Sequence, residues 1–105
     1  MRRGEVWWAQ LRPPSGPKRP VLLLHRDQAY AVLSGFVAAE ITRTVREISS
    51  CVLLTKADGM PTRCVVSCDN LVTVPRDRLV SRMTSLSAEK MRGVDTALRF
   101  VLALR

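Results

Sequence analysis

The sequence lacks the motifs of several large enzyme classes. It contains no glycine-rich phosphate-binding loop, no nucleophile elbow and no cluster of carboxylates of the kind that binds Mg²⁺. Its single histidine, His25, follows an apolar run, where a packed or hydrogen-bonded side chain is expected rather than a catalytic one. Any reaction must therefore use cations, hydroxyl groups and at most one or two carboxylates.

Cysteine is scarce, and its spacing is uninformative for metals. Of the three cysteines, Cys51, Cys64 and Cys68, the last two do not have the separation of a paired-cysteine zinc knuckle. On an extended strand they would lie on one face but roughly 13 Å apart, too far for a disulfide. We expect all three to be reduced, half-buried apolar residues, and we expect no metal and no other cofactor.

Long apolar runs are also missing. No segment reaches the roughly 18 residues that a membrane-spanning helix needs. The charged first residues are not followed by the apolar core and cleavage site of a signal peptide. The expectation is a cytoplasmic protein without membrane contact, in which residues 1–105 form a single domain.

Negative charge is outnumbered by positive charge. Seventeen Lys and Arg against nine Asp and Glu leave a formal net charge of +8, and fourteen of the cations are arginine. The planar guanidinium group can donate two parallel hydrogen bonds to a phosphate. A basic surface of this kind favours a nucleic acid as partner. The alternatives are a basic protein that is merely soluble and one that an acidic partner neutralises.

Alternating apolar and polar residues predict a mainly β protein. Strands are expected at residues 5–11, 20–25, 36–42, 50–55 and 64–74, the last bent near 69–70, with a proline-rich loop at 12–17 and a short helical turn at 27–33. The run 20–25 suits a strand buried on both faces. In 36–42, Val37, Ala39 and Ile41 share one face, and Ala38, Glu40 and Thr42 belong to the other, which is expected to be polar.

The end of the chain changes period. Ser87 is expected to be the N-cap of a helix, and Glu89 would lie favourably in its first turn. Apolar residues then follow at helical spacing: Met91, Val94, Leu98, Val101 and Leu102. Several short strands followed by one amphipathic helix favour a small barrel, because closing the sheet removes its exposed edges.

RNA cleavage needs only the groups that this sequence has. The ribose 2′-hydroxyl is a nucleophile beside the phosphorus that it attacks, so an enzyme need only align it, stabilise the developing charge and assist proton transfer. No metal is obligatory. DNA lacks this hydroxyl and would be inert to the same site.

Five segments, in the correct order, resemble the toxins of the MazF/PemK family. They are residues 4–8 (GEVWW), 19–24 (RPVLLL), 37–42 (ending in Ile-Thr), 67–74 (SCDNLVTV) and 86–98, the beginning of the expected helix. The resemblance covers nearly the whole chain. It implies an SH3-like β-barrel of the CcdB/MazF type with a C-terminal helix, and a homodimer.

The resemblance also implies a function. Such a toxin is a sequence-specific, metal-independent endoribonuclease that cuts single-stranded RNA to 2′,3′-cyclic phosphate and 5′-hydroxyl ends. A cognate antitoxin would block its RNA groove with an acidic or apolar segment. By position, the catalytic arginine of the family falls on Arg19 and its catalytic threonine on Thr42. Arg19 ends the proline-rich loop at the mouth of a buried strand, and Thr42 closes the polar face of its strand.

The first loop departs from the family pattern, in which it commonly carries an acidic residue. Here residues 13–18 contain no carboxylate. Glu40 lies on the same strand face as Thr42, with Cα atoms roughly 6.6 Å apart. We hypothesise that Glu40 helps to accept the 2′-hydroxyl proton. The alternative is a carboxylate at the rim of the site, paired with Arg43 or Arg46.

The remaining site predictions concern RNA binding. The candidates for holding nucleotides beside the cleaved bond are Ser15, Lys18, Arg43, Thr44, Arg46 and Asn70. Trp7 and Trp8 must point to opposite sides of their strand. One is expected in the core, and the other would be free to stack on a base or to seal the dimer.

Two further readings of the sequence stay open. A non-catalytic toxin of the CcdB type would share the barrel, and a passive RNA-binding barrel would share the charge. A helix-turn-helix regulator is disfavoured because only one long helix is expected.

Overall fold

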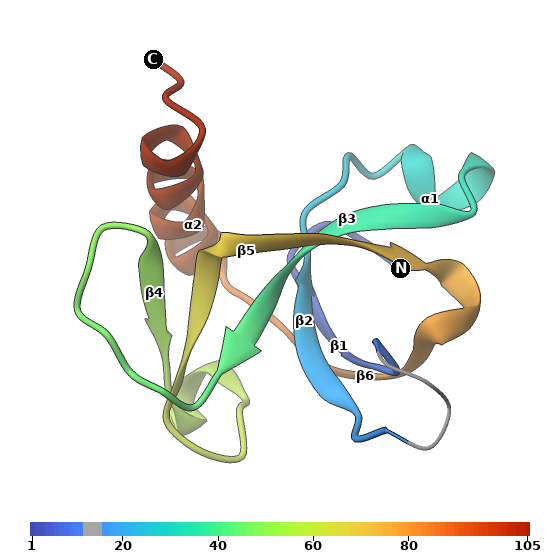
Figure 1. Ribbon diagram of the computed structural model, residues 1–105, viewed down its shortest axis with the longest axis horizontal. Helices are drawn as coiled ribbons and strands as arrows, with labels where there is room; N and C mark the ends of the chain where they lie inside the picture. Colours follow the sequence, from blue (N-terminus) through green and yellow to red (C-terminus); the bar gives the residue numbers. More distant parts are fainter. Residues whose placement is uncertain (12–15) are drawn as a thin grey trace.

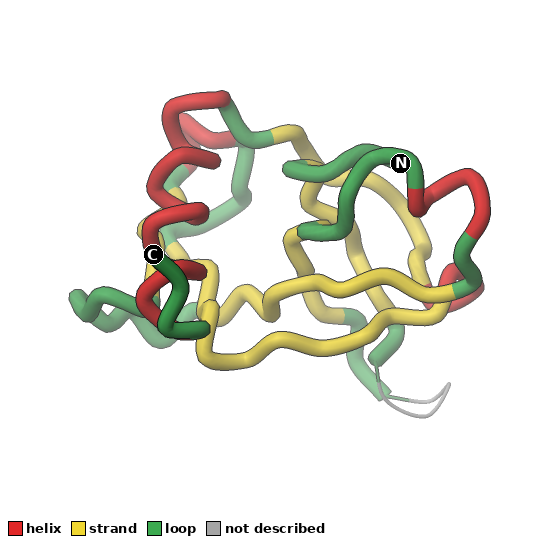
Figure 2. Tube along the Cα trace, turned by 90° about the horizontal axis from the view of Figure 1, so that it is seen from above, coloured by secondary structure: helices red, strands yellow, loops and turns green. Residues whose placement is uncertain are grey.

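The structure is a computed structural model that describes residues 1–11 and 16–105. Its elements, drawn in Figure 1, are β1 (Glu5–Ala9), β2 (Arg19–Leu23), α1 (Ala29–Val32), β3 (Gly35–Thr42), β4 (Cys51–Leu54), η1 (Lys56–Asp58), β5 (Cys64–Pro75), η2 (Arg76–Arg78), β6 (Leu79–Ser85) and α2 (Ala88–Val101). Both views place α2 at one end of the molecule and α1 with η2 at the other (Figures 1 and 2). No helix among the described residues has the length and apolar character needed to span a membrane.

The strands form one antiparallel sheet in the order β4-β5-β3-β2-β1-β6. The long strand β5 pairs with β4 through its first four residues and with β3 along most of its length. Its register shifts between the pairs Glu40↔Ser67 and Ala39↔Leu71, so the bend predicted near residues 69–70 is confirmed. An inserted stretch of this kind bends the strand and increases its twist. The sheet therefore curls into a barrel-like shape (Figure 1).

The two edge strands of the curled sheet, β4 and β6, are brought together by the turn η1, which follows β4 and packs against β6. Thr55 and Asp58 cap η1 reciprocally, since the Thr55 hydroxyl accepts from the backbone of Ala57 and the Asp58 carboxylate accepts from the Thr55 amide. The turn is fastened to β6 because the Thr84 hydroxyl donates to the Asp58 carbonyl over 3.1 Å. This side-chain hydrogen bond connects the two edges of the sheet, which backbone hydrogen bonds between strands would connect in a closed barrel.

Strand β2 separates two apolar clusters. Leu22 packs in the larger cluster, which also contains residues of α2, whereas Val21 and Leu23 pack in the smaller one with Tyr30 and Phe36. The prediction of a strand buried on both faces is confirmed. His25 is structural, as expected, because its Nδ1 accepts from the Val37 amide over 3.0 Å.

Helix α2 begins where the sequence predicts. The Ser87 hydroxyl accepts from the Lys90 amide over 3.1 Å, and Val94 and Ala97 are buried against the larger cluster. The predicted apolar stripe, however, includes one residue beyond the end of the helix. The helix ends at Val101, and Leu102 is 50% exposed because it follows the last turn.

The strand β6 was not predicted from the sequence. Its burial pattern does not alternate, and its pairing with β1 shifts register twice. Such irregularities erase the two-residue period on which strand prediction depends.

The three cysteines are unpaired, as expected. Cys51 is half-buried, and Cys64 and Cys68 are buried more fully than predicted, at 3% and 0% exposure. Burial raises the pKa of the Cys64 thiol, with a smaller contribution from Asp58. Both buried thiols belong to the larger apolar cluster and act there as small apolar side chains.

Candidate active site

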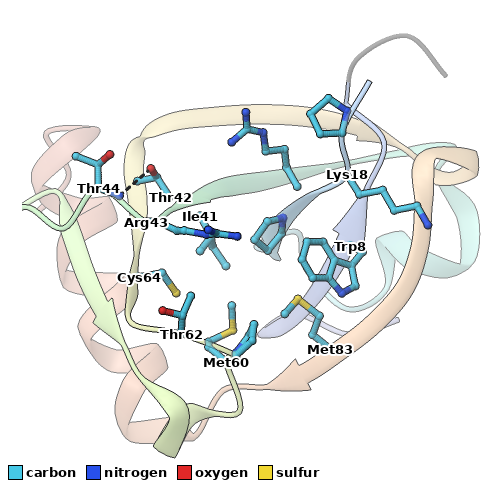
Figure 3. Close-up of a pocket in the computed structure, with 14 residues that line it drawn as sticks. Trp8, Lys18, Ile41, Thr42, Arg43, Thr44, Met60, Thr62, Cys64 and Met83 are labelled. Atoms are coloured by element: carbon cyan, nitrogen blue, oxygen red, sulfur yellow. Dashed lines mark hydrogen bonds between the residues drawn. The ribbon is translucent and has the colours of Figure 1, made fainter. Parts of the chain in front are cut away.

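A pocket of about 460 Å³ opens at the start of β2 and the end of β3. Figure 3 shows the fourteen residues that line it: Trp8, Pro17, Lys18, Arg19, Pro20, Ile41, Thr42, Arg43, Thr44, Met60, Pro61, Thr62, Cys64 and Met83. They come from five strands, β1, β2, β3, β5 and β6, from the loop before β2 and from the loops that follow β3 and η1. The pocket unites the two residues predicted to be catalytic, Arg19 and Thr42.

The pocket opens because β2 and β3 stop pairing before they end. The last pair in their ladder is Val21↔Glu40, and beyond it the strands diverge (Figure 1). Arg19 is instead paired with Ala9 of β1, and Thr42 with Val65 of β5. Each backbone is thus held by its other neighbour, which leaves space between the two side chains.

The Thr42 hydroxyl has a defined role in the local backbone. Its Oγ1 accepts a hydrogen bond from the Thr44 amide over 3.2 Å, drawn as a dashed line in Figure 3. A hydroxyl that accepts one bond still has its own proton to donate. Thr42 is therefore oriented by the chain that follows it and can donate into the pocket.

The charge of the pocket is of one sign. Lys18, Arg19 and Arg43 line it, and none of its lining residues in the described chain is acidic. All three cations are exposed at its rim. Field lines of like charge converge in a cleft, so a phosphate is attracted more strongly than by isolated surface cations. Among the residues described, no group of three His, Cys, Asp or Glu side chains is placed to hold a metal ion.

Glu40 lies next to the pocket but does not line it. It is half-buried within the sheet, where it pairs with Val21 of β2 and Ser67 of β5. In the part of the chain that the structure describes, it forms no ion pair with Arg43 or Arg46, so the alternative role suggested for it is not observed.

The predicted RNA-binding residues divide into two groups. Lys18, Arg43 and Thr44 line the pocket. Arg46 and Asn70 are exposed and lie outside its lining, and the Asn70 amide donates to the Ser67 hydroxyl over 2.9 Å. Ser15 lies outside the described residues.

The two neighbouring tryptophans differ in their surroundings. Trp7 packs against the smaller apolar cluster, and its indole N–H donates to the Glu5 carboxylate over 3.0 Å. Trp8 is half-buried on the opposite side of β1, where it lines the pocket. The alternation of the two side chains was predicted from the sequence, but which of them lies in the core was not.

The apolar wall of the pocket was not predicted from the sequence. Met60 is 4% exposed and follows the η1 turn, and Met83 belongs to the unpredicted strand β6. No local pattern marks either methionine, because the fold brings them together from the two edges of the sheet.

Comparison with known proteins assigns the family. The family described as PemK-like, MazF-like toxin of type II toxin–antitoxin systems matches residues 2–102. A probable endoribonuclease, MazF2 of Mycobacterium tuberculosis (strain H37Rv), is 38% identical over 100 residues, which are 94% of this chain and 95% of that protein. Another from the same strain, MazF5, is 37% identical over 97 residues, 91% of this chain and 87% of that protein.

Solved structures agree. The Mycobacterium tuberculosis toxin MazF-mt6 has a TM-score of 0.87 at 31% identity, with 96% of this chain and 98% of that chain covered. A mycobacterial endoribonuclease in complex with its cognate antitoxin has a TM-score of 0.88 at 25% identity, with 100% and 97% covered. The predicted fold class is confirmed. The chain belongs to the PemK-like, MazF-like family of toxins of type II toxin–antitoxin systems.

Proposed function

We propose that this protein is an endoribonuclease toxin that cuts single-stranded RNA in the pocket between β2 and β3. The observation that carries the proposal is that Arg19 and Thr42 line one cationic pocket. It is supported by the relatives named as endoribonucleases at 37–38% identity over nearly the whole chain. The same relatives favour catalysis over the CcdB-type and passive RNA-binding alternatives.

The reaction is an internal transesterification. The ribose 2′-oxygen attacks the adjacent phosphorus, the bond from phosphorus to the 5′-oxygen breaks, and a 2′,3′-cyclic phosphate and a 5′-hydroxyl result. The 2′-hydroxyl gives up its proton, and the departing 5′-oxygen gains one. Negative charge grows on the non-bridging oxygens in between, and groups aimed at this charge lower the barrier.

Arg19 and Thr42 supply those groups. An arginine side chain stays protonated at neutral pH, so Arg19 acts by electrostatic stabilisation and by donating to the phosphate oxygens. The Thr42 hydroxyl accepts from Thr44 and donates to a second non-bridging oxygen. We further propose that Glu40, two residues before Thr42, helps to accept the 2′-hydroxyl proton through a bridging water.

The neighbouring cations extend the site along the RNA. Lys18 and Arg43, with the Thr44 hydroxyl, would bind the phosphates beside the cleaved one. Arg46 and Asn70, which are exposed outside the pocket, and Ser15 of the first loop would bind nucleotides further along the strand.

The proposed partners follow from the charge and the family. A solved relative is an endoribonuclease in complex with its cognate antitoxin. We propose that an acidic or apolar segment of a cognate antitoxin occupies this pocket and excludes RNA, and that the toxin acts in the cytoplasm as a homodimer without a cofactor.

The decisive experiment combines cleavage and mapping. Purified protein is incubated with a long RNA in EDTA, and the 5′ ends are mapped. We expect a small set of cuts that share a sequence, 5′-hydroxyl and cyclic phosphate ends, and loss of cutting in Arg19→Ala. Growth arrest with intact RNA would instead support a CcdB-type toxin. Salt-dependent RNA binding with neither cleavage nor growth arrest would support a passive RNA-binding barrel.

A further inference from the structure

We propose that the apolar wall of the pocket, formed by Trp8, Met60 and Met83, is a nucleobase subsite that holds one unpaired base against the Trp8 indole. This inference rests on the proposed function, because it assigns a place to the base of a nucleotide whose phosphate lies among the cations of the same pocket. It adds a residue that determines which RNA sequence the enzyme accepts.

The first observation concerns Trp8 itself. Trp7, its neighbour, has its indole N–H bonded to Glu5, whereas the Trp8 indole N–H has no hydrogen-bond partner among the described residues. A tryptophan that is half-buried and faces a cavity usually presents its N–H to a partner. The free N–H donor of Trp8 suits the polar edge of a base, and its indole ring suits the π-face of a base.

The second observation is that the pocket combines polar and apolar groups. Figure 3 shows Thr42 and Thr44 on one side, Trp8 and Met83 on the other with Lys18 beside Trp8, and Met60 along the bottom. A nucleotide likewise combines a charged phosphate with a flat apolar base. The pocket volume of about 460 Å³ lies within the range of small-ligand sites, about 300–1,000 Å³.

The third observation is that the apolar wall is built to keep its shape. Gly59 has a φ of +90°, and a Cβ added there would lie 2.3 Å from the Thr84 hydroxyl, so the turn sits directly on β6. Together with the hydrogen bond from the Thr84 hydroxyl to the Asp58 carbonyl, this packing holds the segment that carries Met60 against the strand that carries Met83. Thioether side chains are polarisable and pack well against aromatic rings. A base stacked on Trp8 would have the two methionines as its floor.

The test separates base recognition from binding of the backbone. The probes are homopolymeric deoxyribonucleotide octamers, which cannot be cut, and an octamer of the same length with abasic sugars throughout. In the Trp7→Phe background, fluorescence reports on Trp8 alone. We expect at least one base-containing octamer to quench this fluorescence, and we expect the abasic octamer to leave it unchanged.

Affinities of variants for the same probes complete the test. Trp8→Ala should weaken binding of the preferred octamer by roughly tenfold and leave the abasic octamer unaffected, since one stacked base contributes about this much. If Trp8→Ala does not fold, Trp8→Leu replaces it, because leucine keeps an apolar side chain in the wall but has no ring. Trp8→Leu should show the same changes in affinity. Trp7→Phe is the matched control and should change neither affinity.

The outcomes distinguish this subsite from the proposed catalysis. Equal losses for both kinds of octamer, or no quenching by any base, would overturn the subsite even if the protein cuts RNA. Base-dependent quenching in a protein that leaves RNA intact would support the subsite and count against the proposed ribonuclease activity.

Discussion

Arg19 and Thr42 face one pocket from the diverging ends of two neighbouring strands. The ladder between β2 and β3 stops at Val21 and Glu40, and each of the two residues is paired on its other side. The sheet therefore fixes both backbones, and both residues line the same pocket of about 460 Å³. Catalytic groups held on strands are positioned more accurately than groups on loops.

The first prediction concerns the charge of Arg19. Arg19→Ala should lower kcat by about 10²- to 10³-fold, the usual loss when one group that stabilises the transition state is removed. Arg19→Lys should restore only part of it, because an ammonium group lacks the planar pair of donors. The side chain is exposed, so Tm should hardly change.

A matched control for Arg19 is Arg92→Ala. It removes the same charge from an exposed position on α2, outside the pocket. Turnover should stay at the wild-type value. If both arginine variants reduce kcat equally, net charge rather than position explains the loss, and Arg19 has no special role.

The second prediction concerns the hydroxyl of Thr42. Thr42→Ser keeps the donor and should retain most of the activity, whereas the nearly isosteric Thr42→Val should lose it in single-turnover cleavage. The Thr44 amide loses its acceptor in Thr42→Val, but it can bond to water at this exposed position, so stability should fall by less than about 1 kcal/mol. Full activity of Thr42→Val would remove the hydroxyl from the mechanism.

The third prediction concerns proton transfer by Glu40. Glu40→Gln should abolish the acidic limb of the pH–rate profile and reduce the maximal rate by about 10²- to 10⁴-fold, the usual contribution of a general base. Glu47→Gln, at an exposed position in the loop after β3, is the control and should keep the wild-type profile. An unchanged pH–rate profile for Glu40→Gln would show that Glu40 takes no part in proton transfer and is only a residue of the sheet.

The positions of Arg19 and Thr42 could be foreseen from local patterns. The continuous apolar run after Arg19 predicted a doubly buried strand, and Val21 and Leu22 do pack in different clusters. The alternation before Thr42 predicted the strand that carries it. Both patterns are local, and the resemblance to a known family gave each residue its candidate role.

The apolar wall could not be foreseen, because it depends on contacts between distant residues. Met83 lies on an edge strand whose register shifts remove any visible alternation. Met60 lines the same pocket, and the turn before it is held on β6 by packing of Gly59 on Thr84, twenty-five positions later in the chain. Likewise, the side on which Trp8 lies follows from how β1 enters the curled sheet, which the alternation of Trp7 and Trp8 leaves undecided.

The fourth prediction tests the contact between Gly59 and Thr84. Gly59→Ala should lower the free energy of unfolding by more than about 1 kcal/mol, because the positive φ disfavours a side chain and the new Cβ meets the Thr84 side chain. Thr84→Ala removes the closest atom, so the cost of Gly59→Ala should be smaller in that background. Urea denaturation of the four proteins measures the coupling. Strictly additive costs would show that the two residues do not interact.

The fifth prediction concerns alkaline stability. Burial, with smaller contributions from Cys51 and Asp69, raises the pKa of the Cys68 thiol from 9.0 to about 11. Below about pH 9 the thiol is protonated in both the folded and the unfolded chain. Between about pH 9 and 11 the unfolded chain loses this proton and the folded chain keeps it, so stability should fall as pH rises. Cys68→Ala should make the fall shallower in urea denaturation between pH 8 and 11. Identical slopes for the two proteins would show that Cys68 ionises as readily in the fold as in water.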